Sequence, residues 1–124
     1  MFGTTGVAYV YMIYGIHHCL NVVAHEREIA GAILVRGVSP LCELEPTDGP
    51  GKLAKALSID RALNGADLVS SRELWLEDDG ARPASIVATP RIGVDYAGEW
   101  AARPWRLFVE GDPHVSGPRR VQRA

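Results

Sequence analysis

Hydrophobic and polar positions alternate along the first 24 residues. Alternate positions from Val7 to Ile13 would point to one face of an extended strand, and the residues between them to the other face. Gly15 interrupts this run, and a second alternating run follows at residues 17–24. The pattern predicts a β-hairpin over residues 7–14 and 17–24, with Gly15 supplying the turn.

The rest of the chain carries signals for one helix and several short strands. A helix is predicted to begin at Pro50, which suits a first helical turn, and to end within residues 60–65. Its apolar stripe consists of Leu53, Ala56 and Leu57. Further strands are predicted at residues 32–38, 74–77, 85–92 and 106–110. Short connections between strands favour a mixed, largely antiparallel sheet with helices packed beside it.

Length and charge limit the function classes. A chain of 124 residues, 47% of them apolar, has room for one small domain with a core. With 15 acidic and 13 basic residues its formal net charge is −2, whereas dedicated non-specific nucleic-acid binders are clearly basic. Residues 1–25 carry no charged side chain, and residues 81–124 carry 7 Arg against 4 acids. These two regions are the expected contact surfaces for a polyanion.

The cysteines and the uncharged first segment bear on the compartment. Cys19 and Cys42 suggest a reducing compartment without a disulfide framework, although two thiols leave one bridge open. Residues 1–25 lack the basic leading region of a signal peptide, and their tyrosines, histidines and glycines do not suit a membrane span. We therefore expect a cytoplasmic protein with no membrane role, associated with the nucleoid if the source is prokaryotic.

Three tyrosines gather in the predicted hairpin. Tyr9 and Tyr11 share a strand face, and Tyr14 lies at the tip beside Gly15. An aromatic side chain at a tip has little core to enter, and it could wedge between stacked bases or stack on a flipped base. The alternative is that Tyr9 and Tyr11 are ordinary half-buried strand tyrosines, since aromatic residues favour strands.

A metal site is not predicted. His17, His18, Cys19 and His25 lie close in sequence, but neighbouring strand residues point to opposite faces. No Cys-x-x-Cys or spaced His pair completes a ligand set.

Gly49-Pro-Gly-Lys52 resembles a phosphate loop only in part. The Walker pattern needs four residues between its glycines and a Ser or Thr after the Lys, whereas Leu53 follows here. A helix start with free N–H groups and an adjacent Lys can hold one phosphate. A plain helix start with a solvated Lys52 is the alternative.

Arg36 lies within an apolar strand, where an unpaired charge is costly. It is expected to face a polar cleft, or a carboxylate in a structural salt bridge.

These features follow one another in an order that resembles the alkyladenine (3-methyladenine) DNA glycosylase family, from Met1 to about Ser116. The motifs are Tyr9-Val-Tyr-Met-Ile-Tyr-Gly15, Asn21, Ile33-Leu-Val-Arg36, Gly49-Pro-Gly-Lys-Leu-Ala-Lys-Ala-Leu-Ser-Ile59, Pro90-Arg-Ile-Gly-Val94 and Pro104-Trp-Arg-Leu-Phe108. The resemblance implies an α+β fold, with a curved, mostly antiparallel sheet, a protruding β-hairpin and flanking helices.

The resemblance assigns roles in base recognition to the hairpin. Tyr14 matches the family's intercalating tyrosine, and Tyr11 matches an aromatic residue that stacks on the flipped base. Asn21 matches the asparagine that screens against the exocyclic group of normal guanine. Tyr9 and Ile16 are expected to contribute to the same base- and DNA-binding surface.

Other matched positions concern water and the DNA backbone. Arg36 matches the arginine that helps to hold the attacking water, and Ile92 matches the residue whose backbone lies beside that water. Gly51 and Lys52 match a helix start that touches the DNA backbone.

The implied function is base-excision repair. Such an enzyme flips an alkylated or deaminated purine out of double-stranded DNA and hydrolyses its N-glycosidic bond, without a metal or organic cofactor. We expect a monomer whose partner is DNA containing damaged purines.

Two departures from the family pattern concern catalysis and domain completeness. The family's catalytic Glu, a stacking aromatic and a base-contacting His precede the residues that match Met1-Phe2, so residues 1–124 are expected to form a truncated, partial domain. The loop at residues 40–48 also looks short, and residues 117–124 are expected to be a disordered tail.

Loss of the Glu removes the base that activates water. Glu26, Glu28 and Asp95 are poor substitutes, because the first two lie in a loop and Asp95 has no matched role. The chain is therefore expected to have lost catalysis. The alternative to an enzyme is a non-catalytic DNA-binding fragment or a decayed gene product.

Overall fold

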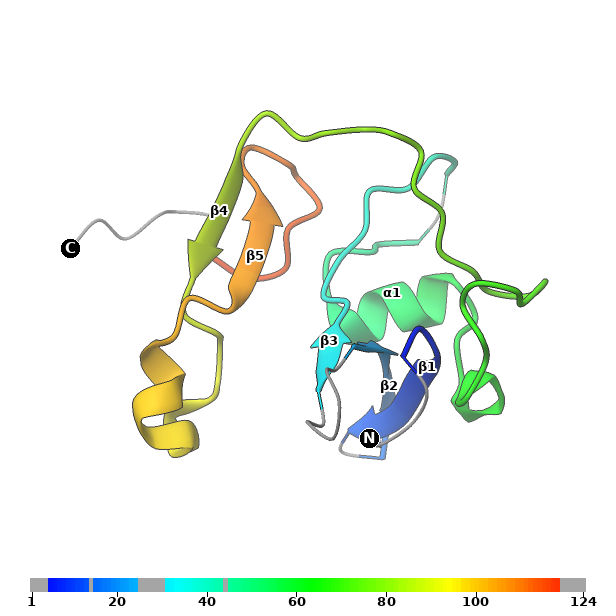
Figure 1. Ribbon diagram of the computed structural model, residues 1–124, viewed down its shortest axis with the longest axis horizontal. Coiled ribbons are helices and arrows are strands. Elements are labelled where there is room, and N and C mark those ends of the chain that lie inside the picture. Colours follow the sequence, from blue (N-terminus) through cyan, green and yellow to red (C-terminus); the bar gives the residue numbers. More distant parts are fainter. Residues whose placement is uncertain (1–4, 14, 25–30, 44, 119–124) are drawn as a thin grey trace.

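The computed structural model describes residues 5–13, 15–24, 31–43 and 45–118 (Figure 1). These residues form an α+β fold with two antiparallel sheets, one of three strands in the order β1-β2-β3 and one that pairs β4 with β5. The strands are β1 (Ala8–Ile13), β2 (His17–Val23), β3 (Ala32–Leu34), β4 (Ile86–Thr89) and β5 (Arg106–Val109). The helices are α1 (Pro50–Ala56) and two 3-10 helices, η1 (Arg61–Leu63) and η2 (Asp95–Ala102).

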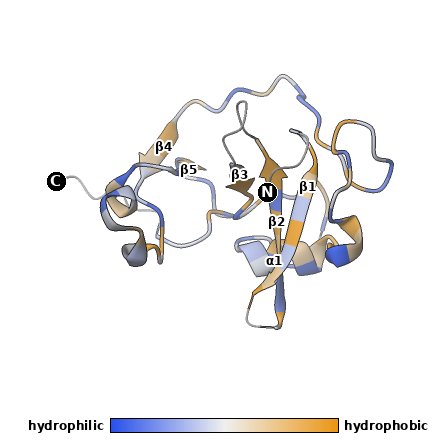
Figure 2. Ribbon diagram, turned by 60° about the horizontal axis from the view of Figure 1, so that its bottom comes forward, coloured by the Kyte–Doolittle hydropathy of each residue, from blue (hydrophilic) through white to orange (hydrophobic). Residues whose placement is uncertain are grey.

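The hairpin predicted from the alternating pattern is confirmed. Strands β1 and β2 pair with Tyr9 opposite Asn21 and Tyr11 opposite Cys19. Gly15 lies between them with φ of 68°, a backbone conformation that residues with a Cβ rarely adopt. Figure 2 shows the hairpin extending past α1 at its far end.

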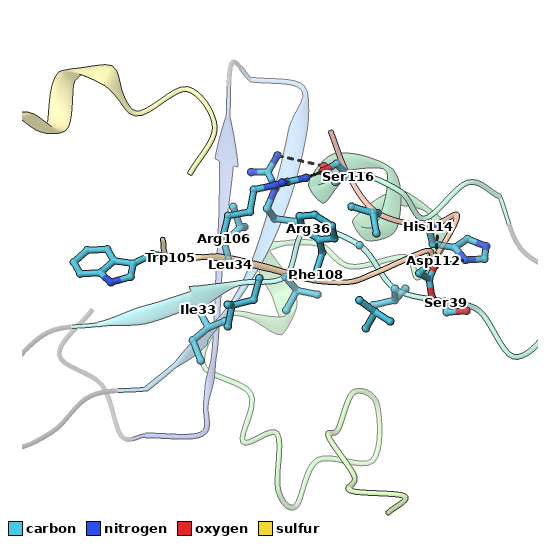
Figure 3. A pocket seen from close by; sticks show the side chains of 16 residues that line it. Ile33, Leu34, Arg36, Ser39, Trp105, Arg106, Phe108, Asp112, His114 and Ser116 are labelled. Atoms are coloured by element: carbon cyan, nitrogen blue, oxygen red, sulfur yellow. Dashed lines mark hydrogen bonds and ion pairs between the residues drawn. The ribbon is translucent and has the colours of Figure 1, made fainter. Parts of the chain in front are cut away.

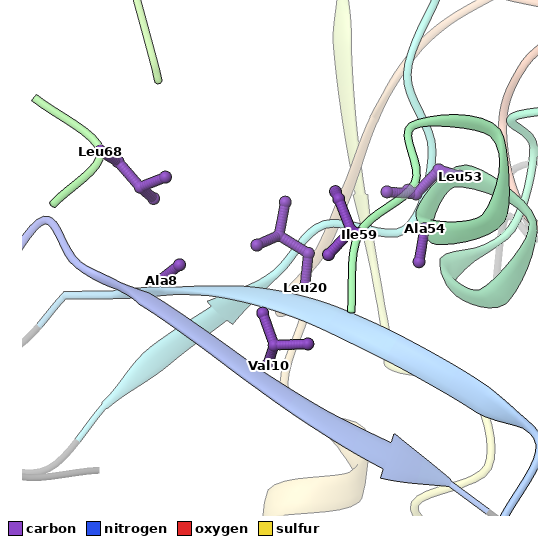
Figure 4. Packing of buried hydrophobic residues seen from close by; sticks show 7 residues of the cluster. All are labelled: Ala8, Val10, Leu20, Leu53, Ala54, Ile59 and Leu68. Carbon is purple, nitrogen blue, oxygen red and sulfur yellow. The ribbon is translucent and has the colours of Figure 1, made fainter. Parts of the chain in front are cut away.

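The core lies between the hairpin and α1. Val10 and Leu20 point from the two strands toward Leu53 and Ala54 of the helix (Figure 4). Leu53 is completely buried, which stabilises the fold by about 1.5–3 kcal/mol. Leu57, predicted to share the apolar stripe, is instead exposed, because the helix ends at Ala56 and Leu57 is its C-cap.

The third strand is shorter than predicted. It ends at Leu34, although the amide of Val35 still donates to the Leu20 carbonyl at 3.0 Å. Beyond this point the backbone pairs with a different segment, since the amide of Val38 donates to the Thr47 carbonyl at 3.2 Å. Residues 35–38 therefore leave the sheet.

Two other strand predictions need correction. Residues 74–77 form no strand, and the Trp75 indole donates to the Glu77 carboxylate within the same short segment. Strand β4 ends at Thr89 rather than at residue 92, because Pro90 has no N–H group to continue the ladder.

The prediction of one curved sheet is also wrong for the described residues. Strands β3 and β5 belong to separate sheets, and the segment after β3 meets the segment after β5 at Gly37 and His114. A Cβ placed on Gly37 would lie 2.6 Å from the His114 carbonyl oxygen. This close backbone approach joins the two halves of the fold.

Residues 117 and 118, the first two of the predicted tail, contact the rest of the chain. Gly117 packs against the Ile92 side chain, and the Pro118 carbonyl accepts a hydrogen bond of 2.7 Å from Arg106. These contacts hold residues 117–118, and residues 119–124 lie outside the described part of the chain.

Candidate functional site

One face of the hairpin carries the predicted base-recognition residues. Tyr9 and Tyr11 lie side by side with ring centroids 5.3 Å apart. Asn21 is opposite Tyr9 in the register and is 6% exposed, and its Nδ2 donates to the Tyr9 carbonyl at 3.3 Å. The strand pairing thus fixes a carboxamide beside two phenol rings, on the face that points away from the core.

Tyr11 remains a neutral phenol at physiological pH. Burial raises its pKa above the usual 10.0, and the neighbouring Cys19 adds to the increase, while a hydrogen bond with Asn21 opposes it. Tyr9 and Tyr96 also raise the pKa of Tyr11. An uncharged aromatic ring that is half-buried in this way can stack on a purine without a charge to desolvate.

Arg36 approaches the same face. Asn21 is paired with Leu34, the last residue of β3, and Arg36 lies in the segment that follows. Burial raises the pKa of the Cys19 thiol, and the nearby Arg36 charge partly offsets this rise. The Arg36 charge therefore lies near Cys19, which is opposite Tyr11 in the hairpin.

The hydrogen bond of Arg36 is to a hydroxyl. Its Nη2 donates to the Ser116 Oγ at 3.2 Å, and its buried Nε has no partner among the described residues. No ion pair with a described carboxylate is formed, so the salt-bridge interpretation of Arg36 is wrong for this part of the chain.

Arg106 is a second arginine of the site that the sequence analysis did not select. It is 6% exposed, and its Nη2 donates to the carbonyls of Ser116 and Pro118, both at 2.7 Å. Its guanidinium carbon also lies 4.6 Å from the centre of the Phe108 ring. Burial lowers the pKa of Arg106, and the Arg36 charge lowers it further. A charged residue within an apolar run, the signal that selected Arg36, is also present at Arg106.

A cavity of about 470 Å³ separates the β3 segment from β5. Figure 3 shows Arg36, Arg106 and Ser116 gathered on one part of its wall, with Asp112 and His114 at another. Among the described residues that line this cavity, Asp112 is the one carboxylate. It accepts hydrogen bonds from the backbone amide of His114 at 2.7 Å and pairs with the His114 ring at 3.1 Å.

Ile92 lies near this cationic wall. Its Cδ1 is 2.6 Å from the position that a Cβ on Gly117 would occupy, so the side chain packs directly on that glycine. Gly117 follows Ser116, the residue that binds both arginines. The structure therefore brings the Ile92 side chain close to the Arg36 site.

The hairpin tip and the helix start lie apart from the cavity. Tyr14 is outside the described residues, and Ile16, which follows Gly15, is 71% exposed. The His17 ring lies against Gly51, where a Cβ would be 3.0 Å from the ring Nδ1. Lys52 is exposed and forms an ion pair of 3.4 Å with Asp48. Gly51 and Lys52 are thus beside the start of β2 rather than at the Arg36 wall.

The histidines and cysteines near the hairpin form no metal site among the described residues. Across the described ranges, no three His, Cys, Asp or Glu side chains gather in a way that could hold a metal ion, and His25 lies outside those ranges. Cys19 is buried and Cys42 is exposed, and both are free thiols. None of the helices within the described ranges is both long enough and apolar enough to cross a membrane.

Comparison with known proteins identifies the family. Residues 1–113 match the methylpurine-DNA glycosylase (MPG) family, and the chain belongs to this family. A relative from Myxococcus xanthus is 53% identical over 123 residues, and one from Methanocella arvoryzae is 48% identical over 130 residues. Both are named "Putative 3-methyladenine DNA glycosylase". The matches cover 95% and 94% of this chain but only 63% and 64% of the two relatives.

Proposed function

We propose that this chain is the DNA-recognition part of a repair glycosylase that flips damaged purines out of duplex DNA. The observation that carries the proposal is the shared face of Tyr9, Tyr11 and Asn21 on the hairpin. The family and the names of the relatives support a glycosylase function in general terms. The chain spans about 63–64% of the length of these relatives. We further propose that the substrate is duplex DNA with a damaged purine.

In the proposed complex, the two tyrosines supply an aromatic wall for the flipped base. Asn21 is held by its contacts with Tyr9 and Tyr11, so its amide has little freedom to move away from a base in this position. A rigid amide disfavours a purine whose substituent it cannot hydrogen-bond. Binding such a purine would bury the amide and the substituent without hydrogen-bond partners, which costs free energy. We assign to Asn21 the exclusion of the guanine amino group.

Arg36 and Ile92 are assigned to the reacting centre. Hydrolysis needs a water that attacks C1′ of the sugar while the purine leaves with the bonding electrons. Among the described residues, Arg36 donates to Ser116 through Nη2 and leaves its Nε without a partner, so it keeps donor groups that can orient the water. Deprotonation of that water requires a carboxylate, and none of the described carboxylates forms an ion pair with Arg36.

Tyr14→Ala tests the proposed wedge at the hairpin tip. We expect the variant to bind a hypoxanthine-containing duplex more weakly by about 1–3 kcal/mol, the value of one lost stacking contact. The measurement is a fluorescence-anisotropy titration with labelled duplex. Leu41→Ala is the matched control, because Leu41 is a fully exposed apolar residue in the loop before α1. Equal affinities for wild type and Tyr14→Ala would contradict the wedge.

A non-catalytic DNA-binding role is the second candidate function. It is favoured by the state of Asp112 in the Arg36 cavity. The Asp112 carboxylate is already hydrogen-bonded to the backbone amide and the ring of His114. Both candidates predict lesion-dependent DNA binding, and only the first predicts base excision once the rest of the family sequence is present.

A further inference from the structure

Two tryptophans and two arginines form a layered stack on the surface between β4 and β5. Trp100 and Trp105 are stacked, with ring centroids 5.5 Å apart and an interplanar angle of 27°. The Arg91 guanidinium lies 5.1 Å from the Trp105 ring centre, and the Arg103 guanidinium lies 5.1 Å from the Trp100 ring centre. We call these four residues the arginine–tryptophan stack. It combines residues that precede, lie within and follow η2.

The stack holds two arginine side chains at the surface without pairing them with a described carboxylate. Neither Arg91 nor Arg103 forms an ion pair within the described part of the chain. Within the described residues Arg91 donates to the Trp100 carbonyl, at 3.4 Å, and its buried Nε has no partner there. Trp100 and Trp105 are 47% and 55% exposed, so the stack faces solvent. Ring contacts orient a guanidinium while leaving its N–H groups free to bind an anion.

One residue of η2 lies near the proposed base-binding face. Tyr96, which is 88% exposed, belongs to η2 together with Trp100. Its hydroxyl is close enough to Tyr11 to contribute to the raised pKa of that residue, after the larger effects of burial and Cys19. Figure 1 shows η2 below β4 and β5. A duplex whose damaged base reaches Tyr11 would therefore pass over or beside the stack.

We propose that the arginine–tryptophan stack binds the phosphodiester backbone of duplex DNA next to the damaged nucleotide. This proposal rests on the proposed function, and it adds a contact surface separate from the hairpin. Planar, unpaired guanidiniums match phosphate oxygens, and phosphate contacts position a protein on DNA without reading its sequence. The stack also gives this chain of net charge −2 a local cationic surface for a polyanion.

Arg103→Gln and Arg91→Gln test the proposal in duplex-binding titrations at several salt concentrations. Each variant should reduce the slope of log Kobs against log salt by about one, because each lost phosphate contact releases about one counterion fewer. Binding to hypoxanthine-containing and undamaged duplexes should weaken by the same factor. Arg103→Lys keeps the charge on an exposed side chain and should keep the wild-type slope.

Arg72→Gln is the control for net charge. Arg72 is exposed in the segment after η1, which Figure 1 places at the opposite end of the molecule from η2. An unchanged salt slope in both Arg91→Gln and Arg103→Gln would overturn the stack as a phosphate site, and so would an equal change of slope in Arg72→Gln. In either case, lesion-dependent binding by the wild-type protein would leave the proposed function standing. Wild-type protein that binds neither duplex would overturn both proposals. Circular dichroism of Arg103→Gln, whose side chain is exposed, verifies that the compared proteins are folded.

Discussion

A polypeptide of these 124 residues is expected to excise hypoxanthine from duplex DNA at no more than the background rate. Hydrolysis of an N-glycosidic bond needs a general base for the water, and its loss typically slows catalysis by about 10²–10⁴-fold. The family resemblance assigns this role to a Glu that has no counterpart among residues 1–124. In the cavity beside Arg36, Asp112 is already hydrogen-bonded to His114.

Single-turnover excision with protein in excess over a hypoxanthine duplex measures this rate. The comparison is a chimera in which the segment of the Myxococcus xanthus relative that precedes its match is joined to Met1, and this chimera should excise the base. Excision by the 124-residue chain at a similar rate would contradict the prediction. Glu26→Gln, Glu28→Gln, Asp95→Asn and Asp112→Asn would then identify the substitute base.

Gly37→Ala is expected to cause the largest loss of stability among the glycine substitutions considered. The added Cβ would lie 2.6 Å from the His114 carbonyl oxygen and 3.4 Å from the Thr47 carbonyl oxygen. Both neighbours are backbone atoms, so neither can move aside by a side-chain rotation. Overpacking of this kind lowers the free energy of unfolding by about 1–3 kcal/mol. To relieve the clash, the segment after β3 would have to move away from residues 112–116. The Arg36–Ser116 hydrogen bond would be strained by the same movement.

Urea denaturation of Gly37→Ala and wild type measures the difference in the free energy of unfolding. Gly49→Ala is the control, because its Cβ would meet only the flexible Lys52 side chain, at 3.5 Å. It should cost less than Gly37→Ala, about 1 kcal/mol or less for the change of N-cap residue. Equal unfolding free energies for wild type and Gly37→Ala would show that the two halves do not depend on this contact.

Local patterns predicted the hairpin and the start of the helix. The alternation on either side of Gly15 determines which residues share a strand face, so the common face of Tyr9 and Tyr11 followed directly from the sequence. Pro50 marked the first residue of α1 because its ring suits that position. The family motifs added Asn21 and Arg36 to the same predicted site, and the structure places the Arg36 charge near Cys19, two residues before Asn21 on β2.

Long-range contacts were beyond these local patterns. Arg36 meets Ser116 across 80 residues of sequence, and Arg106 contacts the same serine, without any periodicity that indicates it. The early end of β3 depends on the pairing of Val38 with Thr47, which is also a tertiary feature. Residues 74–77 have strand-forming side chains but find no partner strand in the described chain, and propensity alone misled the prediction.

The most direct test of the account is whether the chain flips a damaged base. A duplex with 2-aminopurine beside hypoxanthine reports the loss of stacking as a rise in fluorescence, independently of excision. We predict a rise when saturating wild-type protein is added, and a much smaller rise when the same reporter flanks an undamaged base. Tyr11→Ala should lose most of the lesion-dependent rise while it retains the salt-sensitive binding to undamaged duplex. An equal rise on damaged and undamaged duplexes, or no rise at saturation, would contradict the proposal that this face of the hairpin recognises flipped purines.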